Sequence, residues 1–371
     1  LGNDDWTALV TMGHQHRVLP LVHARLSGEG AGWPVPDSFR ATCAESFRGY
    51  SFHAIRSQRV TALAVRTLAK RGIAAIPLKG AWLAFHAYAQ PGLRPLRDID
   101  LLVPEEQALE AFALLRAGGL NLLDPDSVDP AASLQVKHQL AALWRASDAV
   151  CVELHHRCFH GHGADPDLAD DPQFHARLIQ GTIADTPVRY MGPEHLLLHL
   201  IVHSAHDHRF DNGPGIFADV TALLASQRVD WAEFWRLADR YRVEPAAKLV
   251  LVTAERLWGA QAVGWEGREG EAAAISDDLV ADVASLSLRD PAASRNLAIS
   301  AELDGRGGLA AKARYALAKL FPPPAVLRAT YAGTGSTADL LRLYLRRWGE
   351  KLANRRSGPD QTMASQTDRA R

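Results

Sequence analysis

The segment Asp98-Ile-Asp-Leu-Leu-Val103 constrains the fold of this chain more than any other stretch. Acidic and apolar residues alternate and then give way to a fully apolar run, which predicts a strand with one end at a site. Because strand side chains alternate between faces, Asp98 and Asp100 share one face. Burying two neighbouring carboxylates without a cation costs roughly several kcal/mol. The pair therefore indicates a divalent metal, since Mg²⁺ accepts protein carboxylates together with phosphate oxygens. The alternative is a strand end whose acids face solvent.

A tight turn precedes this strand in the sequence. The apolar run 73–78 has the length of a strand and is followed at once by Lys79-Gly80 and a short helix. A glycine turn that leads into a helix N-terminus directs backbone N–H groups outward, which favours an anion. Lys79 adds a point charge for phosphate, and Arg94 and Arg97 can approach from the loop before the carboxylates. The alternative is a glycine turn with surface charges.

A third acid occurs in the apolar run Val150-Cys-Val-Glu-Leu154. An acid inside an apolar strand is unusual for a core position. Strand parity places Glu153 on the same face as Cys151 and His155, opposite to the apolar residues. Glu153 therefore either faces solvent on an edge strand or joins the metal site.

The order of the predicted elements is strand, helix, strand, helix and hairpin, which indicates an α+β fold with a small mixed sheet. An N-terminal helical segment (1–72) is expected to pack on this α/β core (73–160). A helical domain (161–356) follows. The polar, apolar-poor tail (357–371) is expected to be disordered.

Hydrophobic periodicity gives three local expectations within this outline. Residues 38–50 and 54–70 are predicted as two separate helices, and residues 135–145 and 149–156 as the two strands of a hairpin. After Asp165 only helices are expected.

Composition bounds the class of partner. The formal net charge of −1 argues against a general nucleic-acid binder, although a groove lined by Arg94, Arg97 and Arg157 would provide a local basic surface. Three cysteines without CxxC spacing favour a reducing cytoplasm. No run of about 18 apolar residues occurs, so no transmembrane helix is expected, and no signal peptide is predicted. The high usage of Ala, Arg and Gly is typical of a GC-rich bacterial genome.

Several runs of the sequence occur in a characteristic order. They are Ile76-Pro-Leu-Lys-Gly-Ala81, Leu93-Arg-Pro-Leu-Arg-Asp-Ile-Asp-Leu-Leu-Val103, Val152-Glu-Leu-His155 and His195-Leu-Leu-Leu-His-Leu-Ile-Val-His-Ser-Ala-His206, followed by Asp219. Together they resemble the bacterial uncharacterised nucleotidyltransferase family of the polymerase-β-like superfamily. The similarity extends from about residue 6 to residue 224.

This resemblance implies a small mixed nucleotidyltransferase sheet whose metal-binding acids are Asp98, Asp100 and Glu153. It also implies Mg²⁺ or Mn²⁺ as cofactor and transfer of a nucleoside monophosphate from an NTP to an acceptor, with pyrophosphate leaving. In such sites one ion activates the acceptor while the other holds the triphosphate, and the third acid is a base or ligand near the acceptor. The broad superfamily has Gly-Ser or Gly-Gly in the turn, where this chain has Lys79-Gly80.

Two histidines extend the predicted site. His203 and His206 are three residues apart on a predicted helix and therefore share one face. They are expected to face the cleft and contact nucleotide or acceptor. One alternative is a structural pair that packs the helix on the sheet, and another is a metal site with Asp207 and His208.

The leading hypothesis is therefore an Mg²⁺-dependent nucleotidyltransferase acting on a small molecule or a protein. One rival is a toxin-like or defence-associated transferase that modifies tRNA or a protein. The near-neutral charge counts against tRNA as its acceptor. A second rival, from another class, is a non-catalytic nucleotide-binding scaffold.

Overall fold

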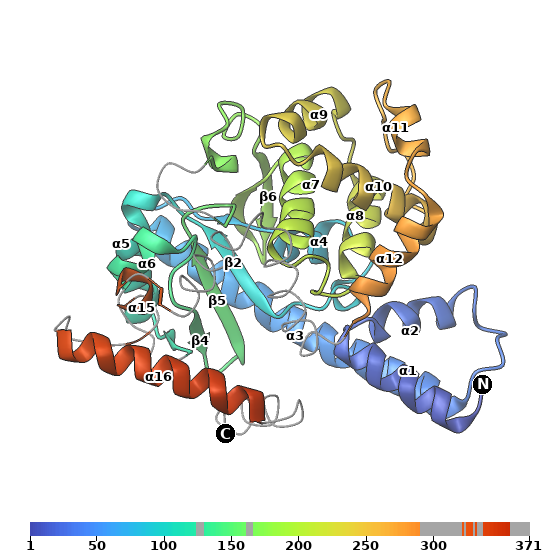
Figure 1. Cartoon of the computed structure of the whole chain (residues 1–371), viewed down its shortest axis with the longest axis horizontal. Coiled ribbons are helices and arrows are strands. Elements are labelled where there is room, and N and C mark those ends of the chain that lie inside the picture. The colour runs from blue at the N-terminus through green and yellow to red at the C-terminus, as the bar shows by residue number, and fades with distance from the viewer. Residues whose placement is uncertain are drawn as a thin grey trace, which may run out of the picture.

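The computed structural model describes residues 1–123, 130–160, 166–289, 321–322, 324–328, 331 and 337–356. They form the expected α+β fold around a mixed five-stranded sheet of order β1-β2-β5-β4-β3. Figure 1 shows β2 and β5 side by side near the centre, with the long helix α3 crossing behind them. The strands are β1 (Ile76–Pro77), β2 (Asp98–Leu102), β3 (Asn121–Leu122), β4 (Leu143–Arg145) and β5 (Val150–His155).

The central strand pair fixes the positions of the predicted acids. β2 runs parallel to β5, and its register pairs Asp98 with Cys151 and Asp100 with Glu153. β1 and β4 flank this pair in antiparallel orientation. Since paired residues of neighbouring strands point to the same side of a sheet, Asp100 and Glu153 lie next to each other. The strand over the acidic segment and its parity are thus confirmed.

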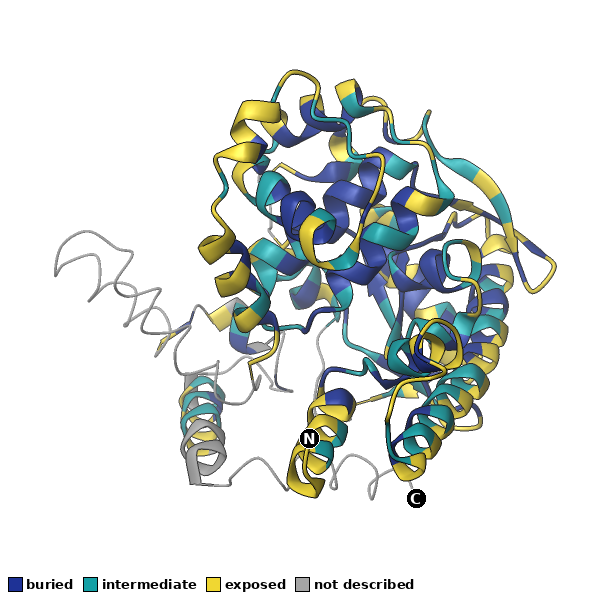
Figure 2. Ribbon diagram, turned by 90° about the vertical axis from the view of Figure 1, so that its right-hand side faces the viewer, coloured by how far each residue is buried: buried dark blue, intermediate teal, exposed yellow. Residues whose placement is uncertain are grey.

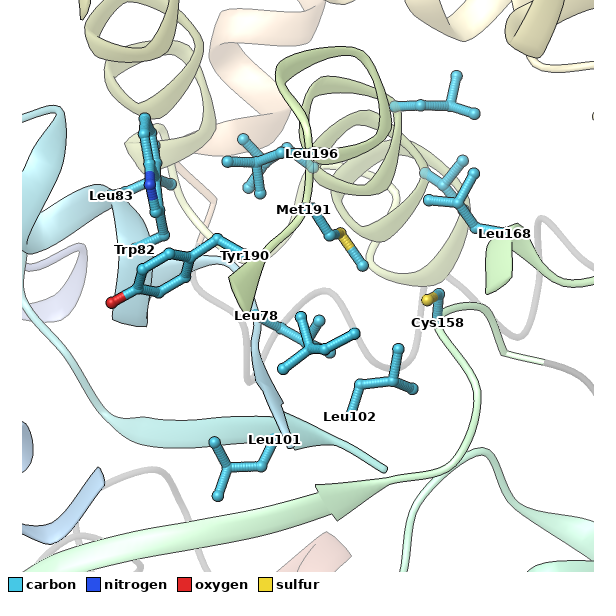
Figure 3. Close-up of a cluster of buried hydrophobic side chains, with 14 of the residues drawn as sticks. Leu78, Trp82, Leu83, Leu101, Leu102, Cys158, Leu168, Tyr190, Met191 and Leu196 are labelled. Carbon is cyan, nitrogen blue, oxygen red and sulfur yellow. The ribbon is translucent and has the colours of Figure 1, made fainter. Parts of the chain in front are cut away.

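The sheet is buried by helices of both flanking regions. One large core cluster joins residues of α3 (Asp37–Ala69), α5 (Ala108–Ala117) and the central strands with residues of the helices that follow the sheet. Leu101 and Leu102 point to opposite sides of β2, and Leu102 approaches the side chains of Cys158 and Met191 (Figure 3). The division of the chain into domains that the sequence predicts stays a prediction.

The N-terminal segment contains α1 (Asn3–Gln15), α2 (Leu19–Ser27) and α3. The prediction of two helices between residues 38 and 70 is wrong, because α3 is one continuous helix of 33 residues. No proline interrupts it, and the Ser51 hydroxyl donates back to the carbonyl oxygen of Phe47 at 2.8 Å, which satisfies this polar group within the helix. α1 is largely exposed (Figure 2).

A second sheet of two strands follows the main one. β6 (Ile179–Ile183) and β7 (Thr186–Tyr190) form an antiparallel hairpin, which corrects the expectation that only helices follow Asp165. Its two-residue turn, Ala184-Asp185, has positive φ at both positions (42° and 62°), as a type I′ turn requires. Neither residue is the glycine that usually marks such a turn, so the sequence carries no hairpin signal there.

Helices predominate in the region that follows the two-stranded sheet. Its helices are α7 (Pro193–Val202), α8 (Gly215–Ser226), α9 (Trp231–Arg240), α10 (Glu244–Trp258), α11 (Glu269–Ala273) and α12 (Asp277–Ser287), with α15 (Pro324–Arg328) and α16 (Thr337–Arg356) beyond them. The predicted disordered tail over 357–371 lies outside the described residues. No helix within the described part of the chain is both long and apolar enough to cross a membrane.

The first strand of the predicted hairpin is shorter than expected. Residues 135–145 contain the end of the helix α6 (Pro130–Val136) and only three residues of strand, in β4. The hairpin itself is confirmed, since β4 and β5 pair in antiparallel orientation around residues 146–149. Pro130 begins α6, a first-turn position that suits proline because the N–H group it lacks would have no partner there.

The buried face of β2 is expected to dominate the stability of the sheet. Leu101 is fully buried, so Leu101→Ala should lower the free energy of unfolding by about 2–5 kcal/mol through lost burial and a residual cavity. Urea denaturation followed by circular dichroism measures this. Leu109→Ala, at a 40% exposed position on α5, is the matched control and should change it by less than about 1 kcal/mol. Equal effects of the two substitutions would contradict the burial of Leu101 in the core of the sheet.

Candidate active site

A cavity of about 470 Å³ collects most of the residues singled out from the sequence. Its walls come from the central strands, from the turn before α4 (Gly80–His86), from the helical region and from the turn between α1 and α2. The predicted site residues that line it are Lys79, Gly80, Arg94, Arg97, Asp98, Asp100, Glu153 and His203. His206 does not line it.

One group of possible metal ligands in the cavity includes a residue outside the predicted site. Ligand atoms of Asp100, Glu153 and His155 all lie within 4.8 Å of one another. The Nε2 atom of His155 lies 3.0 Å from Oδ1 of Asp100 and 3.8 Å from Oε2 of Glu153. Asp98 lines the same cavity but falls outside this group. The sequence placed His155 on the face of Glu153, yet gave no reason to include it in the site.

The carboxyl groups of the cluster influence one another strongly. Burial, followed by the charges of Asp100 and Asp98, raises the pKa of Glu153 to about 7. Burial and the charge of Asp100 also raise the pKa of Asp98. Burial alone would raise the pKa of Asp100 as well, but Lys79 and His155 together hold it well below its usual range. The site therefore contains more negative charge than its own cations neutralise.

Lys79 joins the cluster of carboxylates through an unusual backbone conformation. Its φ of 43° and ψ of −112° lie where glycine is favoured and an ordinary side chain is strained. The side chain is nearly buried, and its Nζ lies 3.2 Å from Oδ2 of Asp100. The sequence predicted a phosphate contact for Lys79. The ion pair with Asp100 adds a role that the sequence did not indicate.

Gly80 gives room to a buried ion pair. A Cβ atom at this position would lie 2.2 Å from Nη1 of Arg94 and 2.7 Å from Cδ2 of Leu96. Arg94 donates from Nε and Nη2 to the two carboxylate oxygens of Asp219, at 3.2 and 2.9 Å, and the Tyr88 hydroxyl donates to the same carboxylate at 2.7 Å. Burial raises the pKa of Tyr88 and Asp219 adds to this, so the phenol keeps its proton.

This pairing changes the role expected for Arg94. The sequence grouped Arg94 with Arg97 as a phosphate contact, whereas two of its donor nitrogens are bound to Asp219. Asp219 lies on α8, so the pair ties the loop before β2 to the helical region. Arg97, in contrast, is exposed in the cavity wall.

The two predicted histidines are separated by a local change of helix type. α7 continues into a π-helical turn over His203–Asp207. The wider π turn changes the angle between residues three apart, so His203 lines the cavity while His206 is exposed outside it. The expectation that both face the cleft is therefore wrong for His206. Burial lowers the pKa of His203 to about 4, which keeps its ring neutral at pH 7.

The donor set of the cluster fits a divalent cation. Asp98, Asp100 and Glu153 supply three carboxylates, and Lys79 supplies one ammonium group, so the cluster carries a net charge of −2 when all four are ionised. Carboxylate oxygens are the ligands that Mg²⁺ and Mn²⁺ prefer. Burial is the largest cause of the raised pKa of Glu153, and the charges of Asp100 and Asp98 add to it.

A second group of possible ligands lies outside the cavity. Asp171, His195 and Glu233 bring ligand atoms within 4.8 Å of one another. Arginines already pair with both of these carboxylates: Arg236 lies 2.9 Å from Asp171 and donates to both oxygens of Glu233 at 2.7 Å. Arg240 lies 3.5 Å from Asp171, and Arg177 lies 3.7 Å from Glu233. We interpret this group as a structural ion-pair network.

Comparison with known protein families agrees with this site. The family model described as uncharacterised nucleotidyltransferase matches residues 2–259, which is more than half of the chain and includes every residue of the cluster. The chain belongs to this family. As a member it is an enzyme of the nucleotidyltransferase class, and its mixed sheet with flanking helices is a nucleotidyltransferase-like fold.

Solved structures and curated proteins add little to the family assignment. The antibiotic-resistance factor ANT(2'')-Ia matches with 18% identity and a TM-score of 0.35, covering 50% of this chain and 92% of its own. A likeness at this level carries no argument about the substrates of this family member. No curated protein matches the chain.

The close contact at Gly80 gives a sharp test of the Arg94 pair. Gly80→Ala should lower the free energy of unfolding by about 1–3 kcal/mol, because the new methyl group displaces Arg94 or Leu96. Gly49→Ala is the control: this glycine lies inside α3 and a Cβ there meets no atom within 4 Å, so it should stabilise by up to about 1 kcal/mol. Chemical denaturation compares them, and equal shifts would refute the crowding at Gly80.

The raised pKa of Glu153 predicts a pH-dependent effect on stability. The folded protein holds a proton on Glu153 that the unfolded chain releases near pH 4.5, so the free energy of unfolding falls as pH rises from about 4.5 to about 7. In metal-free buffer with EDTA, Glu153→Gln should therefore match the wild type at pH 4 and exceed it by about 1–3 kcal/mol at pH 8. Denaturant midpoints at both pH values measure the difference. A stability difference between Glu153→Gln and the wild type that is equal at both pH values would contradict the raised pKa of Glu153.

Proposed function

We propose that this nucleotidyltransferase moves a nucleoside monophosphate from an NTP to a small-molecule or protein acceptor in a reaction that depends on Mg²⁺ or Mn²⁺. The observation that carries the proposal is the cluster of three carboxylates on the neighbouring strands β2 and β5, opened into a cavity that is also lined by basic side chains. Lys79 neutralises only one of these charges. The family assignment supports the same type of reaction in general terms.

Each member of the cluster has a distinct part in this proposal. Asp98, Asp100 and Glu153 would hold the divalent cation, which when bound shields the phosphate charge and orients the triphosphate. Asp100 keeps its negative charge because Lys79 and His155 contact it. Glu153, next to it in the register, faces the acceptor, either as a ligand of the cation or as the base that takes the acceptor proton.

The reaction balances with the groups that the cavity supplies. An acceptor oxygen forms a bond to the α-phosphorus, and the bond from this phosphorus to the bridging oxygen of the β-phosphate breaks. Pyrophosphate leaves with the electron pair, and the acceptor proton passes to a carboxylate such as Glu153 or to solvent. Basic side chains at the cavity would stabilise the charge that develops on pyrophosphate.

The contacts of two arginines count against a tRNA acceptor. A basic groove was considered from Arg94, Arg97 and Arg157, but Arg94 is paired with Asp219 and Arg157 is buried. These three residues therefore form no continuous exposed basic surface. This observation favours a small-molecule or protein acceptor over a nucleic acid.

Nucleotide transfer with labelled substrate tests the proposal. The protein is incubated with Mg²⁺, each α-labelled NTP and candidate acceptors, and pyrophosphate release is followed. Asp98→Ala/Asp100→Ala should lower the rate by at least roughly 100-fold, because the cation loses two ligands. The control is Asp277→Ala/Asp278→Ala, at exposed positions on α12, which should retain the wild-type rate.

Two outcomes would overturn parts of this proposal. Pyrophosphate release that persists in Asp98→Ala/Asp100→Ala would remove the active-site assignment. Tight NTP binding by the wild type without transfer to any acceptor would instead favour a nucleotide-binding scaffold that retains the fold. Normal binding and turnover in Glu153→Gln would leave Glu153 as a structural strand residue only.

A further inference from the structure

The turn between α1 and α2 contributes to the cavity, although the sequence indicated no functional role for it. His16, Arg17, Val18 and Leu21 all line the cavity. The ring of His16 fixes the turn to the helical region, since its Nε2 lies 3.0 Å from the carbonyl oxygen of Leu288. The N-terminal helical segment is therefore a wall of the site as well as a packing element.

Arg17 occupies a backbone position that favours glycine. Its φ is 57°, in the left-handed region, at the end of α1. The N–H groups of Arg17 and Val18 bond to the carbonyl oxygens of His14 and Gly13 at 3.1 and 3.0 Å. This is the usual helix end at which glycine is preferred, because it lacks a Cβ atom.

The chain uses glycine at the same kind of helix end elsewhere. Gly72 follows α3 with a φ of 73°, and its N–H and that of Ile73 bond back to the carbonyl oxygens of Ala69 and Leu68. An arginine in this conformation is strained, and such strain is commonly retained where the side chain has a function. Other non-glycine residues of the chain, such as Arg242, share this conformation, so what distinguishes Arg17 is its place in the cavity wall.

The guanidinium of Arg17 lies among the charged groups of the cavity. Burial first, and then the neighbouring Arg97, lower the pKa of Arg17, while Tyr50 and Asp98 oppose this and Arg94 adds to it. Within the described part of the chain, neither Arg17 nor Arg97 has a side-chain hydrogen bond or an ion pair. Lys79 and Arg94, by contrast, are each paired with a carboxylate.

We propose that Arg17 is a triphosphate-binding residue, which together with Arg97 holds the phosphates that leave as pyrophosphate. Two neighbouring guanidiniums repel each other, and an anion between them removes this repulsion while accepting bonds from both. The proposal rests on the proposed function, because it assumes that an NTP enters this cavity. It assigns to the N-terminal helical segment a part of the substrate site that lies outside the sequence motifs around the acids.

A matched pair of substitutions tests this role. Arg242 ends α9 in the same way: its φ is 57°, and the N–H groups of Arg242 and Val243 bond to the carbonyl oxygens of Asp239 and Ala238 at 2.9 and 2.8 Å. It is exposed and does not line the cavity. Arg17→Gly and Arg242→Gly therefore make the same chemical change at the same backbone conformation, one inside the site and one outside it.

The expected results separate binding from folding. Both variants should unfold at the wild-type temperature or above it, because glycine removes the left-handed strain. Arg17→Gly should bind an α,β-methylene NTP analogue with Mg²⁺ roughly 10- to 100-fold more weakly, the value of a charged hydrogen bond. It should lose affinity for tripolyphosphate by a similar factor, but keep its affinity for the nucleoside monophosphate. Arg242→Gly should bind all three like the wild type.

Each contrary result has a defined meaning. Unchanged binding of the analogue and of tripolyphosphate by Arg17→Gly would overturn the inference and leave the proposed function intact. Loss of binding together with a lower unfolding temperature, absent from Arg242→Gly, would assign Arg17 a structural role and also overturn it. Arg17→Asn repeats the test with a side chain larger than that of glycine, because asparagine also tolerates the left-handed conformation. A wild type that binds no NTP with Mg²⁺ would overturn the inference and the proposed function together.

Discussion

Repulsion between carboxylates on two parallel strands is the constraint around which this site is organised. The register of β2 with β5 fixes Asp100 beside Glu153, so the site must supply positive charge to hold the sheet together. Lys79 and His155 supply part of it at Asp100. The proposed divalent cation would neutralise the remainder, and its binding would then stabilise the centre of the sheet.

The arginine side chains around the carboxylates differ in whether an ion pair already holds them. Arg94 is committed to Asp219 and joins the loop before β2 to α8. That pair fits only because Gly80 has no side chain. The glycine that the sequence assigned to an anion-binding turn therefore also shapes an ion pair between two parts of the chain, while Arg97 lines the cavity.

The sequence predicted those features of the site that depend on residues close together in the chain. Alternation along each strand was sufficient to place Asp98 and Asp100 on one face, and Glu153 on the face of Cys151 and His155, because parity needs no knowledge of distant contacts. That these two faces coincide depends on the pairing of β2 with β5, and before the structure only the family resemblance implied it. The partner of Arg94 could not be found in this way, since Asp219 lies 125 positions further along the chain. The β6–β7 hairpin was missed because its turn residues lack a glycine signal.

Helix type and helix ends limited the prediction in a similar manner. His206 was assigned to the cleft on the assumption of ordinary helical spacing, which the π turn breaks. Arg17 carried no motif at all, since a left-handed residue other than glycine leaves no pattern in the sequence. His155 had the right parity, but its contact with Asp100 depends on the pairing of two strands that are distant in sequence.

The continuity of α3 has a mechanical consequence. A helix of 33 residues is about 50 Å long, and this one packs against α1 and α2 and against β2 and β5 farther along its length. It therefore forms a continuous connection between the N-terminal helices and the strands that carry the acids. Because α3 contains no loop, the turn between α1 and α2 can move away from the cavity only if α1 and α2 slide along α3 or if α3 bends.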